Sequence, residues 1–397
     1  MALAAHLLED LALKNFPMKP LAAAALCMLA LGAQAQLQPR VSVGIEHDTN
    51  VLLVPAGAGE KSDDVGTAAI GLKWDHQYSL QRFTVDVEAA TYRYRDLTNL
   101  DYSTLNYKAA WDWHVTPAFH GILSADRRQY RDITDTVEGV NTIGRRTERS
   151  EVLDGTYDLD GPWRLTAGVS HAESSTTVPL SWDASPRINS ARAGVGYESS
   201  TGSSLYGRYR HGKGEYTALT GPGPADFTED EAEADMIWVV SGKTTVDARL
   251  GHLRRQHNGA PQRDFSGPVG SANVNWNITA KTRLQAGIVR DLSASGLDVG
   301  GHVESTRYFL GPVWNATALT SVSLRFDRTN RNWKDVPAGS LEANREDVVE
   351  SESLGVDWSP RRWVTVTAAV RHERLSSNIP GANYKNTGTS LGAKFTF

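Results

Sequence analysis

The chain has 397 residues, of which 22% are charged and 40% hydrophobic, and its formal net charge at pH 7 is −5. After the N-terminal region, no apolar run approaches the roughly 20 residues that a membrane-spanning helix needs, which excludes a helical membrane protein. The single cysteine excludes a disulfide scaffold and a cysteine-based zinc site. A slightly acidic chain also gives no reason to expect nucleic acid as a partner.

The N-terminal segment, residues 1–35, has the pattern of a secretory signal peptide. Residues 18–20 open a short basic region, residues 21–32 are apolar, and residues 33–35 supply small side chains before a cleavage site at Gln36. Residues 1–17 fit poorly in front of this pattern, so we expect translation to start at Met18. The mature chain, residues 36–397, is expected to be a single exported domain without cysteine.

An alternation of apolar and polar residues recurs about every 20 residues along the mature chain. A period of two predicts strands with one apolar and one polar face, and about 18 such strands can be counted. No stretch of the mature chain has a convincing helical pattern. The clearest strands fall within residues 41–46, 83–89, 231–240, 246–250, 272–278, 322–327 and 364–371.

The connections between these strands alternate in length. Eight short turns, for example at 199–202 and 241–243, alternate with nine mostly longer polar loops, for example at 55–63 and 132–144. This asymmetry and the even strand number are typical of a transmembrane antiparallel up-and-down β-barrel, and they leave both termini on the side of the short turns. A water-soluble sandwich is the rival fold, but its strands would not all keep one dry face. We therefore expect an all-β outer-membrane barrel of about 18 strands.

Nine of the eleven tryptophans lie beside a predicted short turn. Such clustering predicts a girdle of aromatic rings at the periplasmic membrane interface, which random core packing would not produce. The chain also ends in an alternating segment with Phe395 and Phe397, which resembles the assembly signal that outer-membrane proteins present to the barrel-assembly machinery. The nine girdle residues are Trp74, Trp111, Trp113, Trp163, Trp238, Trp276, Trp314, Trp358 and Trp363.

The segment 41–53, VSVGIEHDTNVLL, resembles the first strand and loop of the EpsL-like outer-membrane family. That family accompanies exopolysaccharide biosynthesis and belongs to the group called "putative β-barrel porin". Further segments agree in order, among them NYKAAWDW at 106–113, RDFSGPVG at 263–270 and LGVDWSPRR at 354–362. The resemblance covers nearly the whole mature chain and implies a role in exporting or assembling a secreted polysaccharide. It carries over no catalytic residue.

If the apolar residues face lipid, the alternating polar residues face the lumen, which in a barrel of about 16–18 strands is wide enough to hold water. Charges of both signs would form ladders across neighbouring strands and set a transverse field at a constriction. Arginine forks and tyrosine rings there would bind sugar hydroxyls and uronate carboxylates, whereas the alternative for any one residue is a plain solvated wall. The candidate pore-lining residues are Asp86, Glu88, Asp126, Arg128, Arg192, Arg208, Arg210, Asp247, Arg249, Arg325, Asp327, Arg371 and Glu373.

Three polar segments lie near the long loops. Residues 92–95 and 206–210 alternate tyrosine with arginine, and we expect them to form an outer aromatic belt that contacts lipopolysaccharide phosphates. Residues 226–235 contain six acidic residues. Their spacing matches no calcium-binding loop, so this segment is expected to be a solvated loop.

The sequence offers no catalytic arrangement. A serine esterase of the outer membrane would need a Ser–His pair near a membrane interface, but the histidines are scattered over different strands. The adjacent Ser170 and His171 would point to opposite faces of one strand. Because no metal-ligand spacing and no phosphate-binding glycine loop occurs either, we expect no enzyme, no metal and no cofactor.

These observations and the resemblance together predict an outer-membrane barrel of a Gram-negative bacterium that provides or supports passage of an exopolysaccharide. The expected partners are outer-membrane lipid and lipopolysaccharide, the barrel-assembly machinery, the polysaccharide itself and periplasmic export components. A general or small-solute diffusion porin is the first alternative. The second is a structural or adhesive barrel that acts through extracellular loops such as 217–226.

Overall fold

The computed structural model describes residues 37–134, 142–177, 185–216, 226–295, 300–340 and 342–397. The predicted signal peptide lies outside these residues. The described ranges form eighteen strands and two short 3₁₀ helices, Thr98–Leu100 and Pro261–Arg263, and no helix among them is long and apolar enough to cross a membrane. The strands are β1 (Leu37–Asp48), β2 (Asp63–Tyr78), β3 (Gln81–Tyr94), β4 (Tyr102–Thr116), β5 (Phe119–Thr134), β6 (Thr142–Asp158), β7 (Trp163–Thr176), β8 (Pro186–Glu198), β9 (Ser204–Tyr216), β10 (Asp226–Ser241), β11 (Thr244–His257), β12 (Phe265–Asn277), β13 (Thr282–Ala294), β14 (His302–Asn315), β15 (Thr320–Lys334), β16 (Glu346–Arg361), β17 (Val364–Ser377) and β18 (Tyr384–Thr396).

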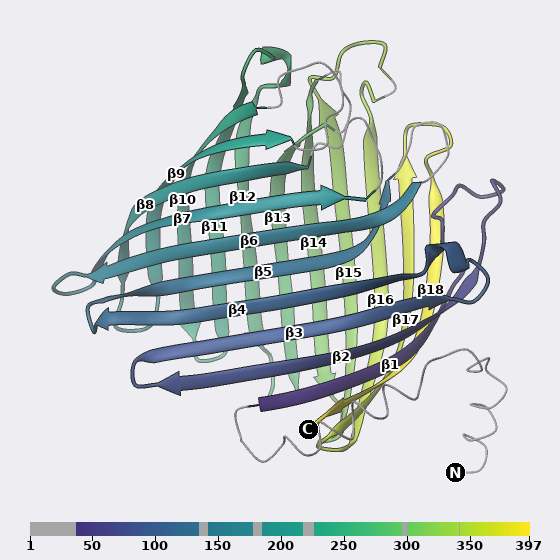
Figure 1. Ribbon diagram of the computed structural model, residues 1–397, viewed down its shortest axis with the longest axis horizontal. Helices are drawn as coiled ribbons and strands as arrows, with labels where there is room; N and C mark the ends of the chain where they lie inside the picture. The colour runs from purple at the N-terminus through teal and green to yellow at the C-terminus, as the bar shows by residue number, and fades with distance from the viewer. Residues whose placement is uncertain (1–36, 135–141, 178–184, 217–225, 296–299, 341) are drawn as a thin grey trace.

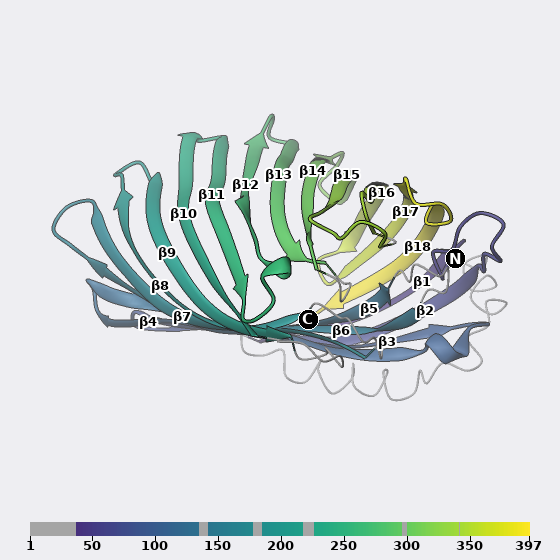
Figure 2. The ribbon, with the colours of Figure 1, turned by 90° about the horizontal axis from the view of Figure 1, so that it is seen from above.

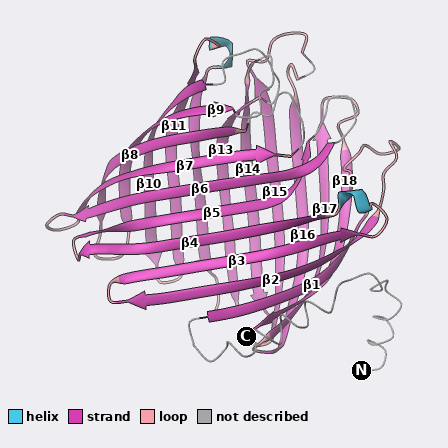
Figure 3. Ribbon diagram, viewed as in Figure 1, coloured by secondary structure: helices cyan, strands magenta, loops and turns pink. Residues whose placement is uncertain are grey.

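Every strand pairs antiparallel with its neighbours in sequence, and β1 also pairs with β18, so the sheet closes on itself (Figures 1 and 3). At the closing seam, Val43 of β1 lies opposite Ala393 of β18, and Ile45 lies opposite Leu391. Closure removes the two free edges that an open sheet would expose to other chains. The predicted all-β, 18-stranded antiparallel barrel is therefore confirmed in the described residues.

The apolar face of the sheet is its outer face. Residues directly opposite each other in an antiparallel pair project from the same face. Leu123 of β5 lies opposite Leu153 of β6, which in turn lies opposite Val169 of β7, and these side chains are 44%, 45% and 54% exposed. Apolar residues that alternate along strands and remain this exposed are typical of a barrel whose outside is covered by lipid.

The connections at the two ends of the barrel differ in length. Only Ser79 and Leu80 connect β2 with β3, whereas residues 335–345 connect β15 with β16. Eight short turns therefore alternate with mostly longer loops, and the start of β1 and the end of β18 lie on the short-turn side, as predicted. Because barrel strands tilt about the axis, the strands β2–β7 cross β10–β18 at a steep angle in Figure 1. Figure 2 shows β10–β18 as a curved wall over the flatter wall that contains β2–β6.

The acidic segment 226–235 belongs to strand β10, so the expectation of a solvated loop is wrong, whereas the strand predicted within residues 231–240 is confirmed. Glu229, Glu231 and Glu233 occupy one face of this strand, while Ala232 and Ala234 occupy the other. The alanines lie opposite the outward-facing residues of β9 and β11, so the acidic residues point inward. A strand tolerates this density of negative charge only where cations neutralise it.

The nine predicted girdle tryptophans lie at the short-turn end of the barrel. Seven of them are 39–52% exposed, namely Trp111, Trp163, Trp238, Trp276, Trp314, Trp358 and Trp363. Trp74 packs on Phe83, with ring centroids 6.3 Å apart, and Trp113 meets Phe119 edge-on at 5.1 Å. Tryptophan combines a large apolar ring system with a polar indole N–H group, so it is favoured at the boundary between lipid and water.

Candidate functional site

The inner face of the barrel is the candidate site. Asp86 lies between the outward-facing Val85 and Val87, and Arg325 lies between Leu324 and Phe326, so both side chains project inward. The same alternation along the strands places every residue predicted to line the pore on the inner face. On the inner face are Asp86, Glu88, Asp126, Arg128, Arg192, Arg208, Arg210, Asp247, Arg249, Arg325, Asp327, Arg371 and Glu373.

Two inner arginines reach across a whole strand to their carboxylate partners. Arg40 of β1 passes over β2 to β3, where its Nη2 lies 2.5 Å from Asp86 Oδ1 and its Nε lies 3.2 Å from Glu88 Oε2. Gly71 lies beneath it, and a Cβ atom there would stand 2.6 Å from Arg40 Nε. A residue with a side chain would therefore block this ion pair.

Arg192 of β8 repeats the arrangement across β7. Its Nε donates to Asp154 Oδ1 of β6 at 2.8 Å, and the residue between them is Gly168, which lies opposite both partners in the register. A Cβ atom on Gly168 would collide with the Asp154 carboxylate. Arg40 and Asp154 were missed in the sequence, because alternation gives the face of a residue but not its cross-strand neighbours.

Strand β10 places its acidic row between arginines of β9 and β11. Glu229 Oε1 lies 2.6 Å from Arg210 Nη2, and the other carboxylate oxygen lies 2.5 Å from Arg255 Nη2. Glu231 lies between two further guanidiniums, with Arg210 Nη2 at 2.5 Å and Arg249 on its other side. Glu231 is only 2% exposed, so its charge is stable there only because these cations accompany it.

The ion pairs between β10 and its two neighbours, here called the β10 lattice, continue toward the short-turn end. Arg249 Nε donates to Glu233 at 2.6 Å, and Arg208 Nη1 donates to Asp235 at 2.9 Å. Four carboxylates on β10 are thus met by four arginines on its two neighbours, Arg208, Arg210, Arg249 and Arg255. This part of the wall is strongly polar but carries little net charge.

An aromatic cluster closes the long-loop end of this wall. The guanidinium of Arg255 lies 4.3 Å from the ring centroid of Phe227 and 5.2 Å from that of Phe265. Its Nη1 also donates to the Tyr216 hydroxyl at 3.2 Å, and that hydroxyl lies 2.9 Å from His257 Nε2. Cation–π and hydrogen-bond contacts together hold Arg255 in one orientation. No sequence motif identified this cluster, because its members come from β9, β10, β11 and β12.

The tyrosine–arginine segments do not form the predicted outer belt. Tyr92 faces inward and stacks on Tyr102 of β4 with centroids 4.4 Å apart, and Tyr206 also faces inward, beneath the guanidinium of Arg208. Only the alternate residues, such as Arg93 and Tyr209, face outward. The expectation is wrong for the inward residues because strand alternation continues through both segments and divides each between the two faces. Residues 206–210 also lie near the short turn that precedes β9 rather than near the expected long loop.

The described residues do not form a hydrolase-like or metal-binding arrangement. Ser170 bonds to Ser190 at 2.8 Å on the inner face, while His171 bonds to Asn189 at 2.7 Å on the outer face. Among the described residues, no three histidine, aspartate or glutamate side chains form a group that could hold a metal ion. What the inner face offers is a fixed arrangement of hydrogen-bond donors and acceptors.

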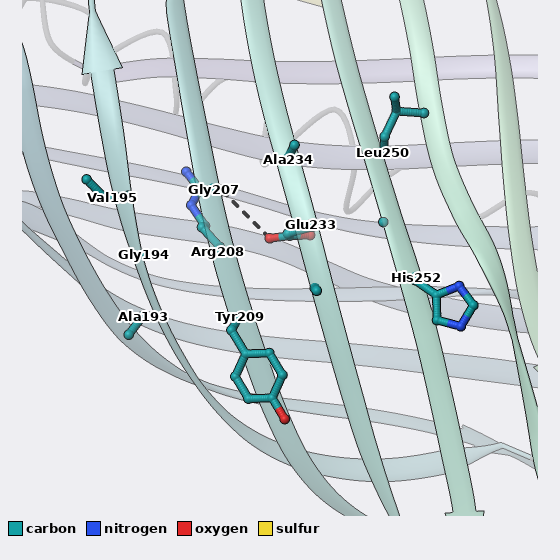
Figure 4. Close-up of a pocket in the computed structure, with 12 residues that line it drawn as sticks. Ala193, Gly194, Val195, Gly207, Arg208, Tyr209, Glu233, Ala234, Leu250 and His252 are labelled. Atoms are coloured by element: carbon teal, nitrogen blue, oxygen red, sulfur yellow. Dashed lines mark ion pairs between the residues drawn. The ribbon is translucent and has the colours of Figure 1, made fainter.

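A shallow, open hollow lies on the outer face of β8–β11 (Figure 4). Small residues, such as Gly207 and Ala234, form its floor, and Val195, Tyr209, Leu250 and His252 surround it. Tyr209 and His252 lie in one cross-strand row on the outward face, so the hollow opens toward lipid. It is therefore separate from the inner wall.

Comparisons with known proteins agree with this architecture. Residues 231–397 match the sequence profile of a family described as "Putative beta-barrel porin 2". No curated protein sequence matches the chain. Among solved structures, the chain is similar to three Pseudomonas aeruginosa proteins. They are OpdK with vanillate (TM-score 0.50, 9% identity, 91% of this chain and 99% of that chain), OccK2 in complex with glucuronate (0.51, 11%, 91% and 96%) and OpdO (0.50, 13%, 91% and 96%).

At these identities the solved structures establish the fold. The closed barrel, its exposed apolar face and its aromatic girdle supply the rest of the argument, because such a surface is stable only in a membrane. The chain is therefore a porin-like β-barrel of 18 strands in the bacterial outer membrane.

Proposed function

We propose that the barrel is a diffusion channel for small hydrophilic solutes. The observation that carries the proposal is the charged inner face of a closed 18-stranded barrel. Barrels of about 16–18 strands are wide enough to leave an aqueous channel. The profile match to a porin family supports a channel, and the small molecules present in the OpdK and OccK2 structures favour small-solute diffusion over passage of a polymer.

Small carboxylates are the solutes that the inner face suits best. Arg371 has loose ion pairs, with Nη2 3.5 Å from Glu46 and Nη1 3.9 Å from Glu373, and its side chain is 46% exposed. Arg128 lies 4.9 Å from the Tyr130 ring, and no described carboxylate is within ion-pair distance of it. Guanidiniums with spare N–H groups bind carboxylates in a bidentate manner. Vanillate and glucuronate, the molecules present in the OpdK and OccK2 structures, are carboxylates and serve as test solutes.

The test is reconstitution of the purified barrel into planar bilayers and liposomes. We expect stepwise ion conductance and faster uptake of glucuronate than of glucose, its neutral counterpart. The variant R128Q/R371Q should lose the preference for glucuronate and keep the uptake of glucose. Absence of conductance and of uptake would contradict the channel, whereas equal uptake of the two sugars by the unchanged barrel would contradict only the preference for carboxylates.

Passage of an exopolysaccharide rests on the family resemblance alone. In the segment that carries it, Asn50 is buried and its side-chain amide donates to the carbonyls of Val54 and Lys385 at 2.8 and 3.0 Å. Val51 is fully buried against Val65 and Tyr94. These residues secure the loop between β1 and β2, so their presence does not by itself point to a polysaccharide. Deletion of the gene, followed by measurement of surface and periplasmic polysaccharide, tests this function; we expect surface polysaccharide to be unchanged.

The structural or adhesive alternative depends on loops such as 217–226. Of that segment only Asp226 lies within the described residues, at the start of β10. If the barrel acts as a channel, replacing the segment should leave conductance unchanged, whereas an adhesive barrel should lose its function.

A further inference from the structure

The outer face of β5 and β6 carries arginines just beyond the apolar belt. Arg127 of β5 lies directly opposite Arg149 of β6, four residues along their strands from the outward-facing pair Leu123 and Leu153. An even spacing along a strand keeps a residue on the same face, so both arginines face outward. Arg145 lies on that face of β6 too, nearer to the long loops. In Figure 1 the long-loop ends of β5 and β6 lie on the right.

Two of these guanidiniums are held by backbone groups of β4. The paired register of β4 and β5 extends only from Thr116↔Phe119 to Tyr107↔Arg127, so residues 102–106 of β4 have no register partner in the described part of β5. The carbonyl of Leu105 accepts a hydrogen bond from Arg127 instead, and the carbonyl of Ser103 accepts one from Arg145 Nη1 at 3.3 Å. A guanidinium has five N–H donors, so each of these arginines keeps donors that point away from the wall.

No carboxylate among the described residues lies within ion-pair distance of Arg127, Arg145 or Arg149. The carboxylate opposite Arg149 belongs to Glu173, which pairs with Arg187 at 3.0 Å instead. Glu151, the next outward residue along β6, forms no ion pair with this group either. Like charges directly opposite each other on a sheet are destabilising, so Arg127 and Arg149 favour an anion that the described residues do not supply.

On the other side of the barrel, outward-facing arginines have a carboxylate partner within the protein. Arg328 of β15 and Arg374 of β17 both face outward, and Glu350 of β16 lies between them in one cross-strand row. Glu350 accepts from Arg328 Nη1 at 2.9 Å and also from Arg374. Both of these arginines therefore have a carboxylate partner within the protein.

We propose that Arg127, Arg145 and Arg149, here called the β5–β6 arginine patch, bind the phosphate groups of lipid A in the outer leaflet. Arginine forks match phosphate oxygens and form strong charge-assisted hydrogen bonds with them. Beyond the next outward pair, Ala125 and Glu151, the apolar Leu123 and Leu153 would contact the acyl chains of the same lipid. An amphiphile with phosphate above and hydrocarbon below satisfies both parts of this surface, whereas a soluble anion satisfies only the first.

The test measures lipid binding to the purified, detergent-solubilised barrel by native mass spectrometry. Bisphosphorylated lipid A and its dephosphorylated form are the two probes. We expect the barrel to retain the bisphosphorylated form, and the variant R127Q/R145Q/R149Q to bind it at least ten-fold more weakly. The matched control R328Q/R374Q removes two outward arginines from the opposite side and should keep full affinity. Heat-modifiable migration in gels and unchanged conductance report that each variant is folded.

Several outcomes would overturn the proposal. Equal retention of the two lipid A forms would show that phosphate is not recognised, and equal loss in the control variant would show that overall charge is responsible. Full competition by inorganic phosphate would assign the patch to a soluble anion rather than to lipid. Should the triple variant fail to fold, R149Q alone replaces it, because Arg149 is exposed and forms no hydrogen bond with another described residue that its loss would break; unchanged lipid affinity in that variant would also contradict the proposal.

Discussion

Arginine rows occur on the inner wall of β9–β11 and on the outer face of β5–β6, and they differ in what lies opposite. On the inner wall, Arg210 lies opposite Glu231 in the register and the two side chains are 2.5 Å apart. On the outer face, Arg127 lies opposite Arg149. Arginine is thus a structural element in the first place, whereas in the second it has no carboxylate partner among the described residues. The cross-strand partner, rather than the presence of arginine, therefore indicates where an external anion can bind.

The largest effect is expected from breaking the inner pairing. E231Q leaves Arg210 and Arg249 without their shared carboxylate in a buried position, and such a loss typically costs about 3–5 kcal/mol. Urea unfolding in lipid vesicles would measure the change in the free energy of unfolding. D247N is the control, because Asp247 accepts only a 3.2 Å hydrogen bond from Asn275 at the surface of the same wall. Equal changes in the free energy of unfolding for E231Q and D247N would mean that the ion pairs of the β10 lattice do not stabilise the barrel more than an isolated hydrogen bond does.

A somewhat smaller effect is expected from filling the space beneath an inner ion pair. G168A places a methyl group against the Asp154 carboxylate and should cost about 1–3 kcal/mol through forced displacement of the Arg192–Asp154 pair. G207A is the matched control, since a Cβ atom on that outward-facing glycine would meet nothing within 4 Å. Thermal unfolding of both variants in one detergent would compare them. If G207A were as destabilised as G168A, strand flexibility rather than the ion pair would be the cause.

The outer patch can be weakened without touching its arginines. R187Q removes the 3.0 Å partner of Glu173, which lies directly opposite Arg149 and can then pair with it. A surface ion pair is worth up to about 1 kcal/mol, which corresponds to roughly a five-fold weaker binding of lipid A. Native mass spectrometry with bisphosphorylated lipid A would detect this change. Unchanged affinity would indicate that Arg149 does not contribute to the patch.

The smallest stability effect is expected at Arg371. Its ion pairs are long and half-exposed, so R371Q should change the free energy of unfolding by less than about 1 kcal/mol. Removing a positive charge from the inner face should nevertheless shift ion selectivity toward cations. Reversal potentials in asymmetric KCl would measure the shift, and a larger anion preference in the variant would contradict an inward, solute-facing Arg371.

The alternation of residues such as Val85, Asp86 and Val87 was sufficient to predict the fold. With a period of two, the chain pattern also reveals which face each strand residue takes, and this placed Asp86 and Arg371 on the inner face. The pattern fails where both kinds of position are polar or small. In β10 the alternation is clear from residue 231 onward, but residues 226–230 are mostly polar and lack it, so the acidic segment 226–235 was expected to be a loop.

The partners of these residues could not be predicted. Which residue lies opposite another depends on the stagger between strands, and a stagger of two residues leaves every apolar face unchanged. Arg40 and Asp86 are 46 positions apart in the chain and belong to strands that are not direct neighbours. The absence of a β4–β5 ladder above Tyr107 is likewise a property of the folded sheet. No single segment of sequence reports it.

The glycines beneath the inner arginines have a consequence for how the barrel assembles. Polar–apolar alternation cannot distinguish the native alignment of β1 and β2 from one displaced by two residues. In a displaced alignment, Ala69 or Lys73 would take the place of Gly71, and the side chain would obstruct the path of Arg40 to Asp86. Gly71 and Gly168 thus favour the native strand alignment, because the bridging arginine can reach its carboxylate only when the glycine lies between the two partners.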